Sequence, residues 1–486
     1  MFLGIDIGTS SVKAVIADSN QTVVAQASAP LVISRPQPLF SEQDPESWWL
    51  AAVEAIQALP KRLRGAVQAI GLSGQMHGAT LLDKAERPLR PAILWNDGRS
   101  AGECQEIERL EPRSREITGN LVMPGFTAPK ILWVRHHEPD IYRNTASVLL
   151  PKDFVRLKLT GEKVSDLSDA SGTSWLDVER RDWSDEMLNA TGLTRIHMPR
   201  LVEGSAPSGQ LRPGIATLLG LPQVTVAGGG GDNAAGAVGM GIVAPGQAFL
   251  SLGTSGVLFV VTDRFRPNPE KAAHAFCHCL PDRWHQMAVL LSAASALDWV
   301  IGLTGFKHVE DGLRAAEGRG ISRNAPFFLP YLSGERTPHN DPNSRGVFFG
   351  MTAETTPADL VGAVLEGVAL AFVDGAEVLL EAGGSIGEIS VTGGGSRSRY
   401  WGQLLAAALN RSLTYRQSGE IGAAFGAARI ARLAATNEAI ETVCIQPAIS
   451  VTIEPNSELN ALLMERRPLF ARLYRDLRSA FKEFSR

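Results

Sequence analysis

The sequence carries the same apolar hairpin pattern twice, and the two copies lie half the chain apart. Residues 5–10 read Ile-Asp-Ile-Gly-Thr-Ser and residues 250–255 read Leu-Ser-Leu-Gly-Thr-Ser, an offset of 245 residues in a chain of 486. Each copy is followed by a β-branched run, so each predicts a strand, a tight turn and a second strand. A repeat on this scale favours two related domains over one large core.

The repeated turn is suited to binding phosphate. Glycine, threonine and serine bring backbone N–H groups and hydroxyls together with no bulky side chain between them. A single Gly-Thr-Ser turn would most simply be an ordinary hairpin end. Two copies in matching surroundings indicate two turns that clasp a nucleoside triphosphate between them. Only the first copy has a carboxylate before its turn, Asp6 in place of Ser251, which predicts that only the first turn faces a metal–phosphate group.

The order of the expected elements predicts an α/β protein with two domains, residues 1–244 and 245–486. Short apolar strands alternate with helical stretches in the first half. The boundary is expected at residues 243–246, just before the second hairpin. A weaker echo, residues 67–74 against 386–393, supports a duplication. We expect helices at residues 47–59, 364–382, 399–409 and 421–435, and an apolar helical stripe at 469–484.

The composition excludes several classes of partner. Lys and Arg number 47 and Asp and Glu number 51, interspersed along the chain, so the formal net charge of −4 gives no basic field for nucleic acid. Glycine, proline or charge interrupts the apolar stretches, which predicts no membrane span. We therefore expect a cytoplasmic protein whose partner is a small molecule, with a homodimer as the assembly to test.

The four cysteines are too few for a disulfide framework in a chain of this length. Cys277 and Cys279 lie near three histidines, His274, His278 and His285, and this combination of side chains is one that zinc can use. Common structural zinc sites separate paired cysteines by two residues or more, however, and here there is one. We therefore predict that these cysteines lie in a buried strand or at its edge, as small apolar side chains.

Asp232 is the candidate general base. It follows Gly228–Gly231 after a β-branched run, and four glycines let the backbone approach a ligand closely. The alternative is that Asp232 only caps the helix expected at residues 233–238. With Asp6 at the first turn, two carboxylates can divide the work. Asp6 would hold magnesium through water, and Asp232 would accept the proton of an attacking hydroxyl.

Two short motifs predict a site for a small polar ligand. Met76 and His77 lie between glycines directly after a strand, so imidazole and backbone can contact a ligand there, although a single histidine is more often structural. Trp95 provides an aromatic wall, and the nearby side chains of Asp97 and Arg99 suit a polyol. Asp97 and Arg99 can equally form a local ion pair.

A glycine-rich turn at Gly393–Gly395 ends one strand and opens a helix. Such a turn can bind adenosine or phosphate at the helix N-terminus. Residues 422–428, rich in glycine and alanine, predict a helix packed tightly beneath that turn. The sequence has no GxxxxGK[ST] loop and no protein-kinase catalytic loop, so phosphate would be held by hairpins instead.

Together these motifs resemble the FGGY family of carbohydrate kinases, within the actin-like ATPase superfamily. The resemblance covers essentially the whole chain, although the segment after Thr436 is less distinctive. The segments that carry it are Gly4–Ser10, Gln75–Gly78, Trp95–Arg99, Phe126–Lys130, Gly231–Asn233, Ser333–Pro338, Gly346–Glu366 and Gly393–Gly395.

The resemblance implies two ribonuclease-H-like domains with a deep cleft between them, and phosphorylation of a sugar by ATP with Mg²⁺. It also implies Asp232 as proton acceptor and Met76 and His77 at a ketose, with D-xylulose as the expected substrate. Ribulose, gluconate or glycerol are the alternative sugars, and an actin-like assembly ATPase is an alternative of another class.

We therefore expect two groups of contact residues. The sugar site comprises Met76, His77, Asn233, Asp97 and Arg99. The ATP and phosphate site comprises Asp6, Gly8, Thr9, Ser10, Lys13, Gly253, Thr254, Gly394 and Gly395, with Asp6 also facing the magnesium ion.

Overall fold

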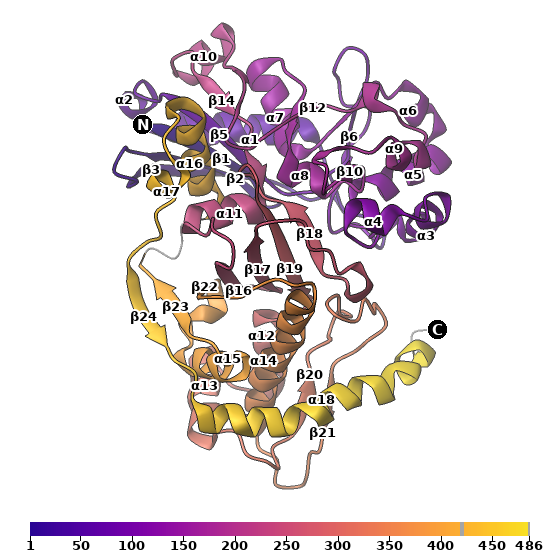
Figure 1. Cartoon of the computed structure of the whole chain (residues 1–486), viewed down its shortest axis with the longest axis vertical. Coiled ribbons are helices and arrows are strands. Elements are labelled where there is room, and N and C mark those ends of the chain that lie inside the picture. The colour runs from indigo at the N-terminus through magenta and orange to yellow at the C-terminus, as the bar shows by residue number, and fades with distance from the viewer. Residues whose placement is uncertain (418–421, 485–486) are drawn as a thin grey trace.

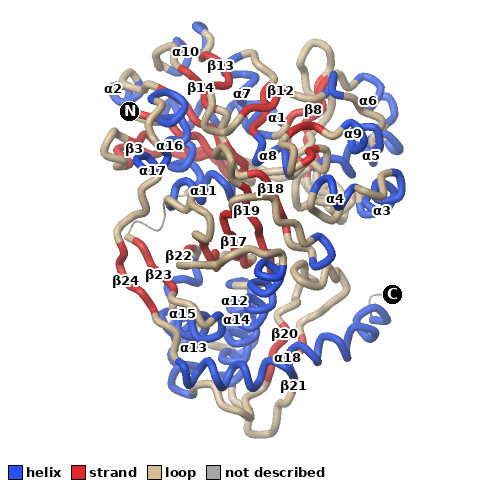
Figure 2. Tube along the Cα trace, in the orientation of Figure 1, coloured by secondary structure: helices blue, strands red, loops and turns tan. Residues whose placement is uncertain are grey.

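The chain forms two stacked α/β domains. The computed structural model describes residues 1–417 and 422–484. Figure 1 shows the N-terminal domain above and the C-terminal domain below. Each domain is built on a mixed β-sheet with helices packed against it (Figure 2). The predicted two-domain α/β fold is confirmed.

The first hairpin lies at the centre of the N-terminal sheet. The strand order is β13-β14-β5-β1-β2-β3, and β15 also pairs with β5. Strands β1, β2 and β3 are antiparallel, whereas β5 runs parallel to β1 and β14 runs parallel to β5. These strands are β1 (Phe2–Ile7), β2 (Ser11–Ala17), β3 (Val23–Pro30), β5 (Ala69–Gly74), β13 (Pro207–Gln210), β14 (Thr225–Ala227) and β15 (Gly230–Gly231).

The second hairpin occupies the same place in the C-terminal sheet, whose order is β18-β19-β17-β16-β22-β23-β24. Strands β16, β17 and β19 are antiparallel, and β22 and β23 continue the sheet in parallel with β16. The echo between residues 67–74 and 386–393 follows from this topology, because β5 and β22 are the parallel neighbours of β1 and β16. The strands are β16 (Ala248–Leu252), β17 (Gly256–Thr262), β18 (His274–Cys277), β19 (Trp284–Leu290), β22 (Ile389–Thr392), β23 (Leu413–Arg416) and β24 (Ile449–Ile453).

The two hairpins differ in their turns. In the first hairpin Ile7 pairs with Val12, so four residues lie between the last paired positions. In the second hairpin Leu252 pairs with Gly256, so only three residues do. The identical Gly-Thr-Ser sequence therefore adopts two different turn geometries on two equivalent sheets.

Helices cover both sheets (Figure 2). Up to Met240 they are α1 (Pro45–Ala58), α2 (Lys61–Arg64), α3 (Ala101–Leu110), α4 (Ser114–Thr118), α5 (Thr127–His137), α6 (Pro139–Asn144), α7 (Pro151–Thr160), α8 (Leu167–Ser171), α9 (Asp185–Ala190), α10 (Pro213–Leu219) and α11 (Asp232–Met240). Beyond it they are α12 (Ala294–Thr304), α13 (Val309–Arg319), α14 (Pro357–Glu381), α15 (Arg399–Leu409), α16 (Ala423–Thr436), α17 (Ile440–Val443) and α18 (Ser457–Phe484).

A helical lobe extends from the N-terminal domain, at the upper right of Figure 1. It has an apolar core of its own, in which Ile107 of α3, Ile131 of α5 and Leu188 of α9 are buried together. Short strand pairs complete the fold: β4 (Glu42–Gln43) with β7 (Ala92–Ile93), β6 (Thr80–Leu82) with β8 (Ser147–Leu149), β9 (Val164–Asp166) with β12 (Arg200–Val202), β10 (Leu176–Asp177) with β11 (Asp182–Trp183), and β20 (Phe327–Leu329) with β21 (Val347–Phe349).

Most of the expected helices are present with small shifts of their ends. Helix α15 has the predicted bounds, and α1 begins behind Asp44, whose side chain accepts a hydrogen bond from the Glu46 N–H. Helix α14 begins earlier than expected because Thr356 caps it together with Asp359. The predicted start at Ile421 lies outside the described residues.

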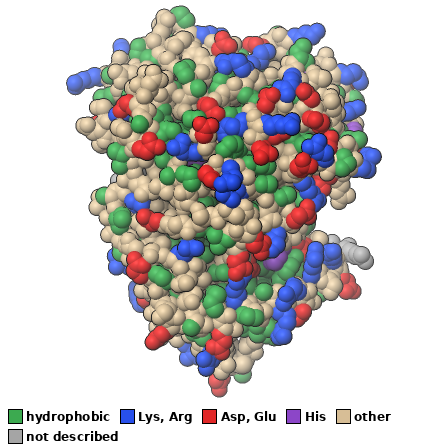
Figure 3. Space-filling view, in the orientation of Figure 1, with side chains coloured by type: hydrophobic (Ala, Val, Ile, Leu, Met, Phe, Trp, Pro, Cys, Tyr) green, Lys and Arg blue, Asp and Glu red, His purple; other side chains and the backbone are tan. Residues whose placement is uncertain are grey.

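The apolar stripe near the C-terminus belongs to α18, and its residues Phe470, Leu473 and Phe481 are buried in the C-terminal core, as predicted. No helix in the described ranges is both long enough and apolar enough to cross a membrane. Acidic and basic side chains alternate over the face shown in Figure 3.

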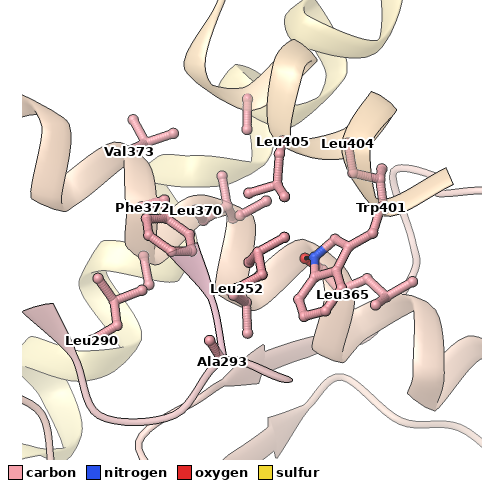
Figure 4. Close-up of a cluster of buried hydrophobic side chains, with 14 of the residues drawn as sticks. Leu252, Leu290, Ala293, Leu365, Leu370, Phe372, Val373, Trp401, Leu404 and Leu405 are labelled. Carbon is pink, nitrogen blue, oxygen red and sulfur yellow. Dashed lines mark hydrogen bonds between the residues drawn. The ribbon is translucent and has the colours of Figure 1, made fainter. Parts of the chain in front are cut away.

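The end of β16 is anchored in the core of the C-terminal domain (Figure 4). Leu252, the last residue of that strand, is buried with Phe372 of α14 and Trp401 of α15. The Trp401 indole N–H donates to the Leu365 carbonyl at 3.2 Å, which fixes α15 against α14. The turn after Leu252 is therefore supported from below by close-packed side chains.

Helix α16 returns to the N-terminal domain although it follows the C-terminal sheet in sequence. A Cβ atom on Gly4 of β1 would lie 1.8 Å from the Ala424 carbonyl oxygen. On the other side of the helix, a Cβ atom on Gly426 would lie 1.7 Å from the Ala235 carbonyl oxygen in α11. Backbone therefore contacts backbone on both sides of α16, which only glycine permits.

This position corrects one prediction. We expected residues 422–428 to pack beneath the turn at Gly393, but they pack on β1, β5 and α11 of the other domain. The small residues indicated close packing correctly. Their partners, Gly4 and Gly71, are several hundred residues away, and a single sequence does not pair them.

We predict that Gly426→Ala destabilises the protein by at least about 3 kcal/mol, because the added methyl group must push α16 away from α11. Gly302→Ala is the matched control, since Gly302 also lies within a helix and has nothing within 4 Å of its Cβ position. That control should be neutral or more stable by about 0.5–1 kcal/mol. Urea denaturation of both variants tests this, and equal stabilities would contradict the close contact.

Candidate active site

Asp6, the penultimate residue of β1, lies near a second carboxylate, Asp232. It pairs with Ser73 of β5 and Lys13 of β2, and its Oδ1 is buried with no hydrogen-bond partner among residues 1–417 and 422–484. Burial, and then the charge of Asp232, raise the pKa of Asp6 from 3.8 to about 6, while Ser73 and Lys13 oppose this shift. The strand register agrees, because Ser73 of β5 pairs with Asp6 on one side and with Gly230, two residues before Asp232, on the other. An unpartnered carboxylate oxygen beside a second carboxylate suits a hydrated divalent cation.

The turn after Asp6 is held rigid by a buried amide network. Gln43 Nε2 donates to the Thr9 carbonyl at 2.7 Å, and Gln75 Nε2 donates to Gln43 Oε1 at 2.9 Å. The Thr9 hydroxyl donates to Gln75 Oε1 at 3.1 Å and accepts from the Trp95 indole at 3.0 Å. Trp95, predicted as a wall of the sugar site, thus also braces the phosphate turn.

The N–H groups of the first turn are only partly used within the chain. Gly8 N–H closes the turn on the Ser11 carbonyl at 3.0 Å. In the described part of the chain, no acceptor is recorded for the N–H groups of Thr9 and Ser10. Those two groups are therefore the ones able to bind a phosphate oxygen.

In the second turn, the carbonyl groups are hydrogen-bonded to the start of α12. Ala294 N–H donates to the Gly253 carbonyl at 2.8 Å, and Ala293 N–H donates to the Thr254 carbonyl at 3.0 Å. Both carbonyls are thereby directed to the start of α12. The N–H groups of Gly253 and Thr254 have no recorded acceptor within the described ranges, which is the arrangement an anion requires.

The glycine turn at Gly393–Gly395 lies directly against this second turn. A Cβ atom on Gly393, whose φ is +90°, would lie 2.6 Å from the Leu252 carbonyl oxygen, and one on Gly395 would lie 2.8 Å from the Trp401 ring. Gly394 has nothing within 4 Å of its Cβ position and so presents open backbone. The structure thus brings together Gly253, Thr254 and the Gly394–Gly395 backbone that we predicted for ATP.

Asp232 is the first residue of α11, and both of its recorded hydrogen bonds fall on one oxygen. Oδ1 accepts from the Asn233 N–H at 2.7 Å and from the Asn233 amide at 2.9 Å. Oδ2 has no recorded partner in the part of the chain that the structure describes. Burial raises the pKa of Asp232, opposed by the two bonds from Asn233. No bond to the later N–H groups of the helix is recorded, so the arrangement favours a proton acceptor over a helix cap.

His77 has a defined tautomer. Its Nδ1 lies 2.6 Å from the Gly172 carbonyl, which can only accept, so Nδ1 carries the proton and Nε2 is left as an acceptor. Burial, and then the charge of Lys130, lower the pKa of His77 to about 3, so the ring stays neutral. Met76 lies beside it, and its sulfur would be 2.9 Å from a Cβ on Gly231. The predicted pair Met76 and His77 therefore lies next to the Asp232 loop.

Lys130 is a positioning residue for which the sequence predicted no role. It lies in the segment Phe126–Lys130, and its buried ammonium donates to the His77 carbonyl at 2.9 Å and the Gly125 carbonyl at 2.7 Å. Burial lowers its pKa well below the ordinary value. His77 has a φ of +69°, which is unusual for a residue with a side chain. Lys130 holds the peptide that adopts this conformation.

Asp97 and Arg99 form the local ion pair that we considered as an alternative. Arg99 Nη2 lies 2.7 Å from Asp97 Oδ2, and both side chains are buried. Arg99 also pairs with Glu42 at 2.7 Å and stacks 3.5 Å above the Phe40 ring. The polar groups of Asp97 and Arg99 are thus already bonded within the protein. Their direct contact with a sugar stays a prediction.

A buried charge cluster lies behind the Asp232 and His77 segments. Lys152 Nζ lies 2.7 Å from Asp153, 2.8 Å from Asp166 and 3.0 Å from Asp169, and all four side chains are inaccessible to solvent. Burial raises the pKa of Asp169 well above its ordinary value, although the charge of Lys152 opposes this shift.

The cluster is connected to both halves of the site. Asp166 accepts from the Ser168 hydroxyl, and that hydroxyl oxygen in turn accepts from the Gly231 N–H at 3.1 Å, one residue before Asp232. Gly172, whose carbonyl orients His77, donates its own N–H to the Asp169 carbonyl at 3.0 Å.

The cysteines and histidines of residues 274–285 are buried, and Cys277 lies in strand β18 as predicted. Within the described ranges, no group of three or more His, Cys, Asp or Glu side chains is arranged to hold a metal ion. A magnesium ion at Asp6 would therefore take its other ligands from water and phosphate, as Mg²⁺ commonly does.

We predict that Asp6→Asn stabilises the ligand-free protein at pH 8 by about 1–2 kcal/mol, because it removes a charge whose burial is unfavourable. A folded-state pKa of about 6 against 3.8 means that this penalty appears as the pH rises through that interval. The gain should therefore vanish at pH 4. Thermal unfolding at both pH values tests this, with the exposed Asp298→Asn as control; an equal gain at pH 4 would contradict it.

Comparison with known proteins identifies the family of the chain. Residues 1–239 match the model for the N-terminal domain of the FGGY family of carbohydrate kinases, and residues 248–435 match the model for its C-terminal domain. The chain is 52% identical to xylulose kinase from Escherichia coli K12 over 479 residues, 98% of this chain and 99% of the relative. It is also 52% identical to xylulose kinase from Klebsiella pneumoniae, with the same coverage.

Solved structures give the same result. The crystal structure of a xyloylose (xylulose) kinase from Brucella ovis superposes with a TM-score of 0.95 at 50% identity and covers 99% of both chains. A gluconate kinase from Lactobacillus acidophilus superposes with a TM-score of 0.94 at 23% identity, again over 99% of both chains, which shows a shared fold. The two domain matches and the close relatives confirm the expected family: the chain is a member of the FGGY family of carbohydrate kinases.

Proposed function

We propose that this protein transfers the γ-phosphoryl group of ATP to the terminal hydroxyl of D-xylulose, giving D-xylulose 5-phosphate and ADP. The proposal is supported by Asp232, whose Oδ2 is unpartnered within the described ranges. The two residues before it, Gly230 and Gly231, pair with the strand next to Asp6, and Gly231 lies against the Met76 side chain. The identity of 52% to two xylulose kinases over 98% of the chain supports this sugar over other members of the family.

Asp232 would act as the general base. Its Oδ2 accepts the proton of the attacking hydroxyl, while the bonds from Asn233 to Oδ1 fix the carboxylate plane. Burial raises the pKa of Asp232, which makes its carboxylate a stronger base than an exposed aspartate. Asn233 retains one amide N–H and its Oδ1 for contact with the sugar.

ATP would lie between the two hairpin turns. The free N–H groups of Thr9 and Ser10 on one side, and of Gly253 and Thr254 on the other, would bind phosphate oxygens, and Gly394 leaves room for adenosine. Asp6 would hold Mg²⁺ through water, and the ion would supply neutralisation of phosphate charge. Lys13, which pairs with Asp6 on the neighbouring strand β2, would add a positive charge near the phosphates.

Sugar selectivity is the part of the proposal most in need of a direct assay. A gluconate kinase shares the fold at a TM-score of 0.94, so the fold does not select the sugar. Release of ADP measured with D-xylulose, ribulose, gluconate and glycerol should give the highest kcat/KM for D-xylulose. A higher value for another sugar would overturn the specificity, and sugar-independent filaments that pellet with ATP would favour the assembly ATPase.

We predict that Asp232→Ala lowers kcat for sugar phosphorylation by about 10²- to 10⁴-fold, since a positioned base contributes a factor of that size. ATP should still bind, because the turns that hold it are intact. Steady-state kinetics and nucleotide titration measure the two effects. A variant that keeps more than about a third of the wild-type kcat, far outside that range, would remove Asp232 from the mechanism.

We predict a slow ATPase without sugar, because water can take the place of the hydroxyl before Asp232. His77→Ala should raise the sugar KM and spare most of this hydrolysis, since the sugar loses its contact with Nε2. Asp232→Ala should lose both activities. Parallel measurement of sugar phosphate and free phosphate tests this; equal loss of both in His77→Ala would place His77 in the nucleotide site or the fold instead.

A further inference from the structure

Arg336 of the C-terminal domain has a partly buried positive charge that forms no ion pair among the described residues. Within the described residues no carboxylate lies within 4.0 Å of its guanidinium, and its one recorded side-chain hydrogen bond runs from Nη1 to His274 Nε2 at 3.4 Å. Burial lowers its pKa. A guanidinium has five N–H donors, so several remain for a ligand.

Both sequence neighbours of Arg336 are hydrogen-bonded to the end of β19 and the residue that follows it. Glu335 Oε1 accepts from the Leu291 N–H at 2.9 Å. Thr337 N–H donates to the Val289 carbonyl at 3.1 Å, and the Thr337 hydroxyl accepts from the Val289 N–H at 3.1 Å. Arg336 is therefore presented from a rigid segment, as a ligand contact requires.

His274 directs the guanidinium. Asn120 Nδ2 donates to two carbonyls, those of Thr118 and Ala275, so Asn120 Oδ1 is the acceptor that lies 3.1 Å from His274 Nδ1. His274 Nδ1 thus carries the ring proton, and Nε2 accepts from Arg336.

Arg336 reaches the sugar side of the site through a continuous set of rings. His274 contacts Phe126 with ring centroids 5.6 Å apart, and Phe126 contacts His77 at 4.9 Å. The charge of Arg336 also lowers the pKa of His77, which agrees with this proximity. Arg336 and His77 come from different domains, so both domains contribute to the same end of the ligand.

The chemistry of a pentulose requires a donor at this position. The only five-membered ring of a 2-pentulose closes through O5, so a sugar phosphorylated on O5 must react in its open form with a free C2 ketone. A ketone oxygen only accepts hydrogen bonds, whereas His77 Nε2 and the Asp232 carboxylate are themselves acceptors. Those groups can bind sugar hydroxyls but not the ketone.

We propose that Arg336 is the residue that recognises the ketone, donating from its guanidinium to the C2 oxygen of the open-chain sugar beside His77. This rests on the proposed function for the identity of the sugar. The binding assay below is independent of phosphoryl transfer, so the two proposals can fail separately.

The test compares a ketose with its alcohols. Calorimetric titration of Arg336→Met should show a dissociation constant for D-xylulose raised about 10- to 100-fold, the range for a lost hydrogen bond to a charged donor. For xylitol and D-arabitol, in which C2 carries a hydroxyl able to donate elsewhere, the increase should be below about threefold. Arg336→Gln, which keeps an N–H donor, should recover part of the xylulose affinity. Arg264→Met, a loss of an exposed arginine in the same domain, is the control.

Stability separates a recognition role from a structural one. Removing a partly buried charge that forms no ion pair should leave the thermal midpoint of Arg336→Met unchanged or higher, whereas a structural arginine would lower it. Equal loss of affinity for ketose and alcohols, unchanged xylulose affinity, or a lowered midpoint would each overturn the proposal. A wild-type protein that binds D-xylulose with the expected Arg336 dependence but does not phosphorylate it would overturn the proposed function alone.

Discussion

The buried contact between Lys152 and three aspartates is the interaction on which the site depends. Its members lie on α7, β9 and α8, and through Ser168 and Gly172 it reaches the segments of both Asp232 and His77. Isolated buried charges are unfavourable, and removing one member of this group, which Arg156 extends at 3.6 Å from Asp153, would leave the others without their partner. The cluster therefore supports both the segment that carries Asp232 and the segment that packs on His77.

The duplication explains why the two hairpin turns of the proposed nucleotide site are alike in sequence and yet differ in their surroundings. Both sheets place a hairpin turn at the same end of an equivalent strand pair, β1–β2 and β16–β17. The first turn adds Asp6 and is braced by side-chain amides. The second is braced by the start of α12 and by the glycine turn before α15. The first turn thus carries a carboxylate that would require a cation, whereas the second turn presents backbone N–H groups.

The sequence predicted features that depend on local pattern and missed those that depend on distant pairing. The hairpins, the helix with the bounds of α15, and the proximity of Asp6, Asp232 and His77 followed from repeated motifs and family resemblance. The position of α16 could not be predicted, because a glycine-rich and alanine-rich segment indicates close packing but does not show which element it packs against. The role of Lys130 was likewise hidden, since a lysine that bonds only to carbonyls has no sequence signature. Asp97 and Arg99 could be read in two ways, and their burial favours the ion pair.

The return of α16 to the N-terminal domain has a consequence for synthesis of the chain. Strands β1 and β5 are made first, but the helix that covers their glycines spans Ala423–Thr436. The first domain to leave the ribosome therefore exposes one face of its central sheet until nearly the whole chain has been translated. Vectorial folding, in which an N-terminal domain is completed before the next begins, is not open to this architecture. The two domains must mature together, and a nascent chain of this kind has reason to engage chaperones that shield apolar sheet surface.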